Sequence, residues 1–232
     1  MTARWRVAGR GVPLVVLAAA LAFGSGATDV AAFTRLGGVF ASVMTGNLVL
    51  LGLSVQRASG ALLAHTAVAI GGYVAGVAAS ARVCARAPGD KALWPRAVNI
   101  ALAVEFAVWA AFTLGWELAR GHPPGSSQLG LLAGAAIAMG LQSEAIRNVG
   151  TTLSTTYLTG TLTGAVADLV TRRRRSALSL AVLAAAAGGA GAGAALIAVA
   201  PAALPVLPLI TVAGVLAVAT TIGVRQPSAT QV

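Results

Sequence analysis

The sequence has 232 residues, of which 57% are hydrophobic and only 9% are charged, and its formal net charge is +10. Soluble domains are typically about one quarter charged, so this chain has too few charges to cover a globule in water. A nucleic-acid-binding protein is excluded as well, because the basic residues lie beside apolar runs and not on a polar face with interleaved aromatics. The composition predicts an all-α integral membrane protein.

Taken in chain order, six apolar segments approach the roughly 20 residues that a transmembrane helix needs. They are residues 12–33, 61–83, 94–118, 129–146, 177–199 and 204–224. The first resembles a signal peptide, but because many spans follow it we expect an uncleaved helix. Two further uncharged segments, 39–55 and 151–170, are shorter or richer in Thr, Ser and Gly, so each can be a full span or a broken one.

The positions of the basic residues choose between six and eight crossings, since short loops rich in Lys and Arg stay in the cytoplasm. With the Arg-rich amino terminus inside, eight crossings would put the basic stretch 82–96 outside. If segments 39–55 and 151–170 are broken or re-entrant, 82–96 and 172–175 both fall inside. We therefore expect about six net crossings with both termini in the cytoplasm.

An offset of 114 residues relates the two halves of the chain. It places Met44-Thr45-Gly46-Asn47 over Leu158-Thr159-Gly160-Thr161, and it lays segment 61–83 over segment 177–199. Halves that each cross the membrane three times must lie in opposite orientations, as in many secondary transporters. The sequence therefore predicts two inverted repeats, 1–118 and 119–232, within a single membrane domain.

The stretches GATDVAAF at 26–33 and VFASVMTGNLVLLG at 39–52 closely resemble the signature of the YoaK family. This is a family of bacterial multi-pass membrane proteins with a domain of unknown function. The aspartate, the phenylalanine and the Thr-Gly-Asn triplet are the specific part, and the resemblance extends over nearly the whole chain. It implies about six transmembrane segments and a bacterial inner membrane, and it supplies no substrate or reaction.

Several polar residues inside apolar segments are candidates for binding a solute or ion. Each Thr/Gly triplet, Thr45-Gly46-Asn47 and Thr159-Gly160-Thr161, can form a site at a broken helix or simply allow close helix packing. Carboxylates in lipid are functional hypotheses by default. Asp29 is such a candidate, or else a capping or interfacial carboxylate paired with Arg35.

Two further carboxylates lie within predicted spans. Glu144 is three residues from Arg147 and can form a local ion pair or a proton relay, and Gln142 beside it makes this the most polar patch of any span. Glu105 lies midway between Trp94 and Trp116, which are roughly 33 Å apart along a helix and match the aromatic belts of a bilayer. Near the bilayer centre we expect the Glu105 carboxyl group to be protonated or to have a close partner. The residue then either has a functional role or forms a hydrogen bond between helices.

The sequence contains no motif for a catalytic nucleophile, no phosphate-binding loop and no residues at metal-ligand spacing. We therefore expect no catalytic residues, no metal and no cofactor. Four consecutive arginines follow segment 151–170: Arg172, Arg173, Arg174 and Arg175. We interpret them mainly as a signal that orients the chain in the membrane, and secondarily as a binding patch for anionic lipid headgroups. These features favour a secondary transporter or permease for a small solute or ion, which could form a homo-oligomer. The alternative is a membrane scaffold without transport activity, or an enzyme acting on a lipid-borne substrate.

Overall fold

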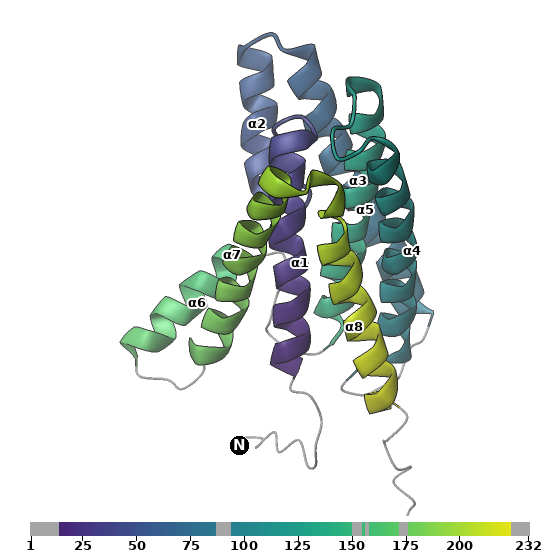
Figure 1. The fold of residues 1–232 in the computed structure, drawn as a ribbon. Coiled ribbons are helices and arrows are strands. Elements are labelled where there is room, and N and C mark those ends of the chain that lie inside the picture. The colour runs from purple at the N-terminus through teal and green to yellow at the C-terminus, as the bar shows by residue number, and fades with distance from the viewer. Residues whose placement is uncertain (1–13, 87–93, 150–154, 156–157, 172–175, 224–232) are drawn as a thin grey trace, which may run out of the picture.

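The computed structural model describes residues 14–86, 94–149, 155, 158–171 and 176–223, and these residues form a bundle of helices (Figure 1). Six of the helices are long and apolar enough to cross a membrane. They are α1 (Leu14–Arg35), α3 (Gly60–Ala85), α4 (Arg96–Leu118), α5 (Gly125–Arg147), α7 (Ser176–Val199) and α8 (Val206–Gly223), the last preceded by the 3-10 turn η1 (Pro201–Ala203). The predicted all-α membrane architecture with six spans is confirmed.

The two ambiguous segments form short helices, α2 (Met44–Gln56) and α6 (Leu158–Val170), of 13 residues each. At a rise of 1.5 Å per residue such a helix is about 20 Å long, well short of a hydrocarbon core of about 30 Å. Before α2, the chain reverses at Gly37 and Gly38, whose φ angles of +97° and +75° favour glycine. The chain then runs back beside α1 before α2 begins (Figure 1).

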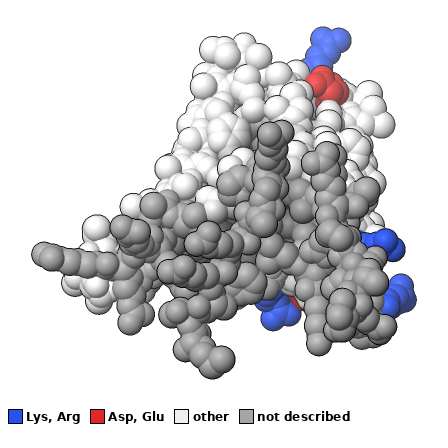
Figure 2. Space-filling view, turned by 90° about the horizontal axis from the view of Figure 1, so that it is seen from below, with Lys and Arg blue, Asp and Glu red and all other residues white. Residues whose placement is uncertain are grey.

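The six long helices alternate in direction, so that the basic ends of α3, α4 and α5 gather at one end of the bundle, whereas α1 ends with Arg35 at the other. The last turn of α3, with Arg82, the start of α4, at Arg96, and the end of α5, at Arg147, all lie at the lower end in Figure 1. The start of α7 and the end of α8 lie there too. Figure 2 views this end, with basic side chains at its edge. The helix ends that flank the stretches 87–93 and 172–175 therefore share one end.

Two helix pairs, α1 with α7 and α3 with α5, form the most extensive contacts of the bundle. Glycine lets their backbones touch, as small residues do between membrane helices. A Cβ added at Gly26 of α1 would overlap the carbonyl oxygen of Ala186 in α7. A Cβ added at Gly140 of α5 would overlap the carbonyl oxygen of Tyr73 in α3. Gly26 and Gly140 are 114 residues apart, the offset predicted for the repeat.

The tryptophans that bracket α4 are not an aromatic belt facing lipid, so that prediction was wrong. Trp94 and Trp116 are both buried inside the bundle. A buried indole N–H needs an acceptor. The Trp116 Nε1 donates to the carbonyl oxygen of Pro201 at 2.8 Å, and the Trp94 Nε1 donates to Asn99 Oδ1 at 2.7 Å. Trp116 thus fastens α4 to the turn that precedes α8.

Candidate functional site

Asp29, on α1, holds the non-helical segment that leads into α2. Its Oδ1 accepts hydrogen bonds from the backbone N–H groups of Ala41, at 2.9 Å, and Ser42, at 2.8 Å, while its Oδ2 accepts one from the Ser42 hydroxyl at 2.5 Å. Non-helical backbone is tolerated at membrane depth only where its polar groups find protein partners or water. The alternative that pairs Asp29 with Arg35 is wrong, because the Arg35 guanidinium donates to the carbonyl oxygen of Ile197 at 3.5 Å.

Asn47, in the first turns of α2, fixes the same segment from its other side. Its Oδ1 accepts from the Phe40 N–H at 2.9 Å, and its Nδ2 donates to the Phe40 carbonyl oxygen at 2.7 Å. Gly46 leaves room for the Phe40 ring, since an added Cβ would lie 3.2 Å from a ring carbon. Thr45 is exposed. Within the predicted triplet, Asn47 and Gly46 therefore position the segment, and Thr45 faces outward.

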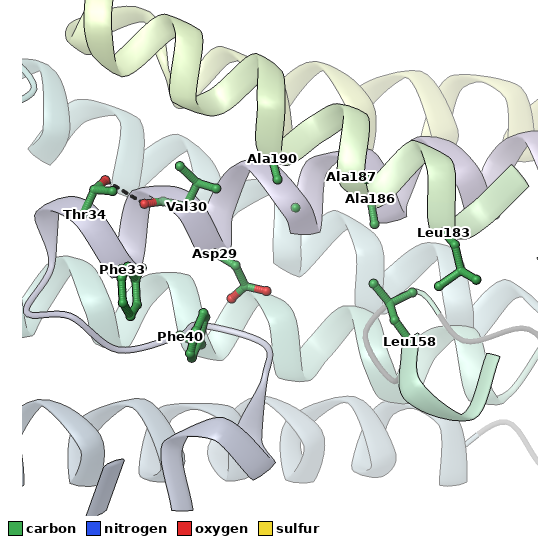
Figure 3. A pocket seen from close by; sticks show the side chains of 11 residues that line it. Asp29, Val30, Phe33, Thr34, Phe40, Leu158, Leu183, Ala186, Ala187 and Ala190 are labelled. Carbon is green, nitrogen blue, oxygen red and sulfur yellow. Dashed lines mark hydrogen bonds between the residues drawn. The ribbon is translucent and has the colours of Figure 1, made fainter. Parts of the chain in front are cut away.

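A cavity of about 480 Å³ lies where this segment meets the second half of the chain (Figure 3). Asp29 points into it from α1. The lining is mainly apolar, and it includes Phe33 and Phe40 from the first half and Leu158, Leu183 and Ala187 from the second half. Among the described residues that line the cavity, Asp29 is the only charged one. The cavity is therefore a largely open apolar pocket with one carboxylate in its wall.

The charge of the Asp29 carboxylate is met by neutral donors. Among the residues that the structure describes, no Lys or Arg side chain lies within ion-pair distance of it. A carboxylate offers about four lone-pair positions, so the three hydrogen bonds from Ala41 and Ser42 leave one unused. A charge in an apolar wall at membrane depth is costly when it has no counter-charge. The site therefore has the electrostatic character of a receptor for a proton or a cation.

The second predicted triplet, Thr159-Gly160-Thr161, follows directly on Leu158 at the start of α6. Thr159 is exposed, and Gly160 and Thr161 are half-buried. The helix α6 packs on α7 and α2 packs on α3, so the triplets do not face each other across an interface. Phe40, in the segment before α2, and Leu158, the first residue of α6, line one cavity instead (Figure 3).

Gln142, buried in α5, links three parts of the molecule. Its Nε2 donates to the Ser25 hydroxyl of α1 and to the Thr155 hydroxyl before α6, each at 3.0 Å. Ser25 lies one helical turn before Asp29. Gln142 therefore joins Thr155 to the part of α1 that lines the cavity.

Glu144 and Arg147, at the end of α5, form the predicted local ion pair. Arg147 donates through its Nε and an Nη atom to the two carboxylate oxygens of Glu144, at 2.7 and 2.9 Å. Asn148 adds a hydrogen bond of 3.0 Å to the same carboxylate. Arg147 is exposed and Glu144 is largely buried. The charge of Glu144 is therefore compensated locally, which favours the ion-pair interpretation over a proton relay.

Glu105 lies away from the cavity, on α4, which packs mainly on α5 and α8. It is fully buried, and its Oε1 accepts a hydrogen bond from the Trp109 Nε1 at 3.1 Å. Its Oε2 has no hydrogen-bond partner in the described part of the chain. The side chain is thus half satisfied, and it forms a second buried polar position separate from Asp29. The described residues contain no cluster of three His, Cys, Asp or Glu side chains that could hold a metal ion.

Some residues of the site were missed by sequence reasoning. Phe33, Phe40 and Ser42 lie inside the two stretches that resemble the YoaK signature, so that signature was the signal for them. Leu183 gave no signal, and Leu158 was named only as part of the repeat alignment, because an apolar residue in an apolar helix is distinguished only by what it contacts in space. The four arginines Arg172, Arg173, Arg174 and Arg175 lie outside the described residues.

Comparison with known proteins decides the family. The model of a family described as "Protein of unknown function (DUF1275)" matches residues 17–222. The chain belongs to this family. The DUF1275 match extends from the first spanning helix into the last one, so it includes both halves of the molecule and every described residue of the cavity.

A curated relative supports the same assignment. The chain is 33% identical over 146 residues to the UPF0700 transmembrane protein YoaK of Bacillus subtilis (strain 168). The match spans 62% of this DUF1275 chain and 62% of the relative's length. No solved structure matches the chain. The predicted membership of the YoaK family is confirmed, and the chain is a multi-pass membrane protein of a family without an assigned function.

Proposed function

We propose that this protein is a secondary transporter or permease for a small solute or ion in a bacterial inner membrane, with both termini in the cytoplasm. The observation that carries the proposal is the cavity of about 480 Å³, which has Asp29 in its wall and no described cationic partner for it. Known ligand pockets are of this size and character, mainly apolar with a few placed polar groups.

The arrangement of the helices supports two inverted halves, 1–118 and 119–232. The short helices begin and end at positions that differ by 114 residues, Met44 to Gln56 against Leu158 to Val170. The same offset relates the pairing of α1 with α7 to that of α5 with α3. Inverted repeats with broken helices at their interface are the plan of many carriers, in which one half moves against the other around a fixed site.

In this proposal Asp29 binds the coupling proton or cation, because it is the charged residue of the cavity wall. Asn47 and Gly46 act as positioning residues for the segment before α2, and Gln142 acts as a positioning residue for Thr155. Glu105 is a further candidate for proton coupling, which would act from outside the cavity. Residues Arg172 to Arg175 would meet anionic lipid headgroups at the cytoplasmic surface.

Currents from proteoliposomes on a solid-supported membrane test the proposal. Solutes of each charge class would be applied in turn to vesicles with the wild-type protein and to protein-free vesicles. We expect at least one class to give a current that needs the protein. The change Ala187→Trp fills the cavity and should abolish the current, whereas Ala184→Trp places the same bulk on another exposed position of α7 that does not line it.

Two outcomes would refute transport through this cavity. The first is that no solute class gives a protein-dependent current. The second is that Ala187→Trp and Ala184→Trp carry the same current as the wild type, which would place any pathway elsewhere in the molecule.

A further inference from the structure

We infer that the cavity binds a small organic cation whose uncharged part is apolar and can pack against aromatic rings. Quaternary benzylammonium compounds represent this class. This inference rests on the proposed function, because it names the substrate class of the same cavity. It goes further in stating the sign of the ligand's charge and the chemistry of the surface that receives its body.

The sign of the charge follows from the surroundings of Asp29. Its three hydrogen bonds come from two backbone N–H groups and one hydroxyl, all of them neutral. The carboxylate also lies against an otherwise apolar lining, where its field is poorly screened. A ligand cation beside the remaining lone pair would supply the missing counter-charge, whereas an anion would be repelled.

The character of the ligand's body follows from the rest of the wall. Phe33 and Phe40 stack on each other with ring centroids 5.2 Å apart, and both rings line the cavity beside Asp29 (Figure 3). Aromatic rings attract quaternary ammonium groups through their quadrupole. The wall opposite consists of Leu158, Leu183 and small alanines of α7. A strongly hydrated inorganic ion would leave this apolar surface without a partner, but an organic cation covers it.

The volume agrees with this class. About 480 Å³ lies within the range of roughly 300 to 1,000 Å³ that is usual for pockets that bind organic molecules. It is far larger than a bare metal cation or one water molecule requires. The cavity therefore suits one ring and one substituted ammonium group together.

Equilibrium dialysis of radiolabelled benzyltrimethylammonium against the purified full-length protein tests the inference. We expect saturable binding that is displaced by the unlabelled cation. The competitor neopentylbenzene has the same shape with carbon in place of the charged nitrogen, and it should displace at least about tenfold less well. The substitution Phe40→Leu should weaken binding roughly threefold to thirtyfold, the range between an exposed and a desolvated cation–π contact.

The variants Ala187→Trp and Ala184→Trp decide the location of the site. Filling the cavity with Ala187→Trp should remove saturable binding, and Ala184→Trp should bind as the wild type does. Asp29→Asn should also lose binding, but Asp29 orders the segment before α2, so the tryptophan pair serves as the test that does not depend on that segment. Equal displacement by neopentylbenzene, or wild-type binding by Ala187→Trp, would overturn the inference.

This measurement is independent of transport. If the cation binds and no solute class gives a current, the carrier proposal fails and the cation site remains. If neutral or anionic solutes give currents and benzyltrimethylammonium does not bind, the substrate class is wrong and the carrier proposal remains.

Discussion

The side chain of Asn47 pairs with both backbone groups of Phe40, seven residues earlier in the chain. The Phe40 N–H donates to Oδ1 at 2.9 Å, and Nδ2 donates to the Phe40 carbonyl oxygen at 2.7 Å. The Asn47 carboxamide thus supplies the hydrogen bonds that the backbone of Phe40 would otherwise form within a helix or with a neighbouring strand. Because Phe40 lines the cavity, a side chain outside the cavity fixes part of its wall.

Asn47→Ala should therefore destabilise the protein. The change leaves the N–H and the carbonyl oxygen of the half-buried Phe40 without their partner, and an unsatisfied polar group costs up to about 1 to 3 kcal/mol when it is fully buried. Thermal unfolding in detergent measures the effect as a lower Tm. The control is Thr45→Ala, two residues away and exposed, which should change stability by less than about 0.5 kcal/mol. Equal effects of the two changes would contradict the role assigned to Asn47.

Gly189→Ala should loosen the contact of α7 with α1. A Cβ at Gly189 would overlap the carbonyl oxygen of Phe23, so the helices must separate, and such overpacking costs about 1 to 3 kcal/mol. Gly191→Ala, on the same helix, meets open space and replaces glycine with a better helix former, so stability should stay the same or rise. The Tm values of the two variants, measured side by side, check the prediction, which fails if Gly189→Ala is as stable as Gly191→Ala.

Glu105→Gln should fold as the wild type does. The amide oxygen still accepts from the Trp109 Nε1, and no described residue donates to the second carboxylate oxygen that the change replaces. Glu105→Ala should be less stable, because it leaves the buried indole N–H unpaired at a cost of about 1 to 3 kcal/mol. If Glu105 couples protons, the Gln variant should keep solute-driven currents and lose their dependence on a pH gradient. Unchanged dependence on the gradient would remove Glu105 from the mechanism.

The six spans and the two short helices could be predicted because charge and hydropathy carry that information locally. Segment 61–83 was expected where α3 spans Gly60–Ala85, and the basic stretch 82–96 required the short segments to be broken. The aromatic-belt interpretation of Trp94 and Trp116 failed, because tryptophan is equally suited to the lipid interface and to the interior of a bundle. The partner that decides between them, such as Pro201 for Trp116, is remote in sequence.

The candidate site was predictable only in part. Asp29 and Asn47 stood out as polar residues in apolar stretches, but their role as hydrogen-bond partners of residues 40–42 depends on the reversal of the chain at Gly37 and Gly38. The contribution of Leu158 and Leu183 arises from the packing of α6 and α7 near α1. Contacts between residues more than 100 positions apart leave no pattern in a single sequence.

The central claim is that the two halves lie antiparallel in the membrane, and cysteine accessibility from each side tests it most directly. In a Cys84→Ser background, single cysteines at positions 57, 86, 120 and 173 would be labelled in intact cells with a membrane-impermeant maleimide. The account predicts that positions 57 and 120 react from outside, and that 86 and 173 react only after the cells are opened. Labelling of 86 and 173 from different sides would contradict the antiparallel halves and the carrier built on them.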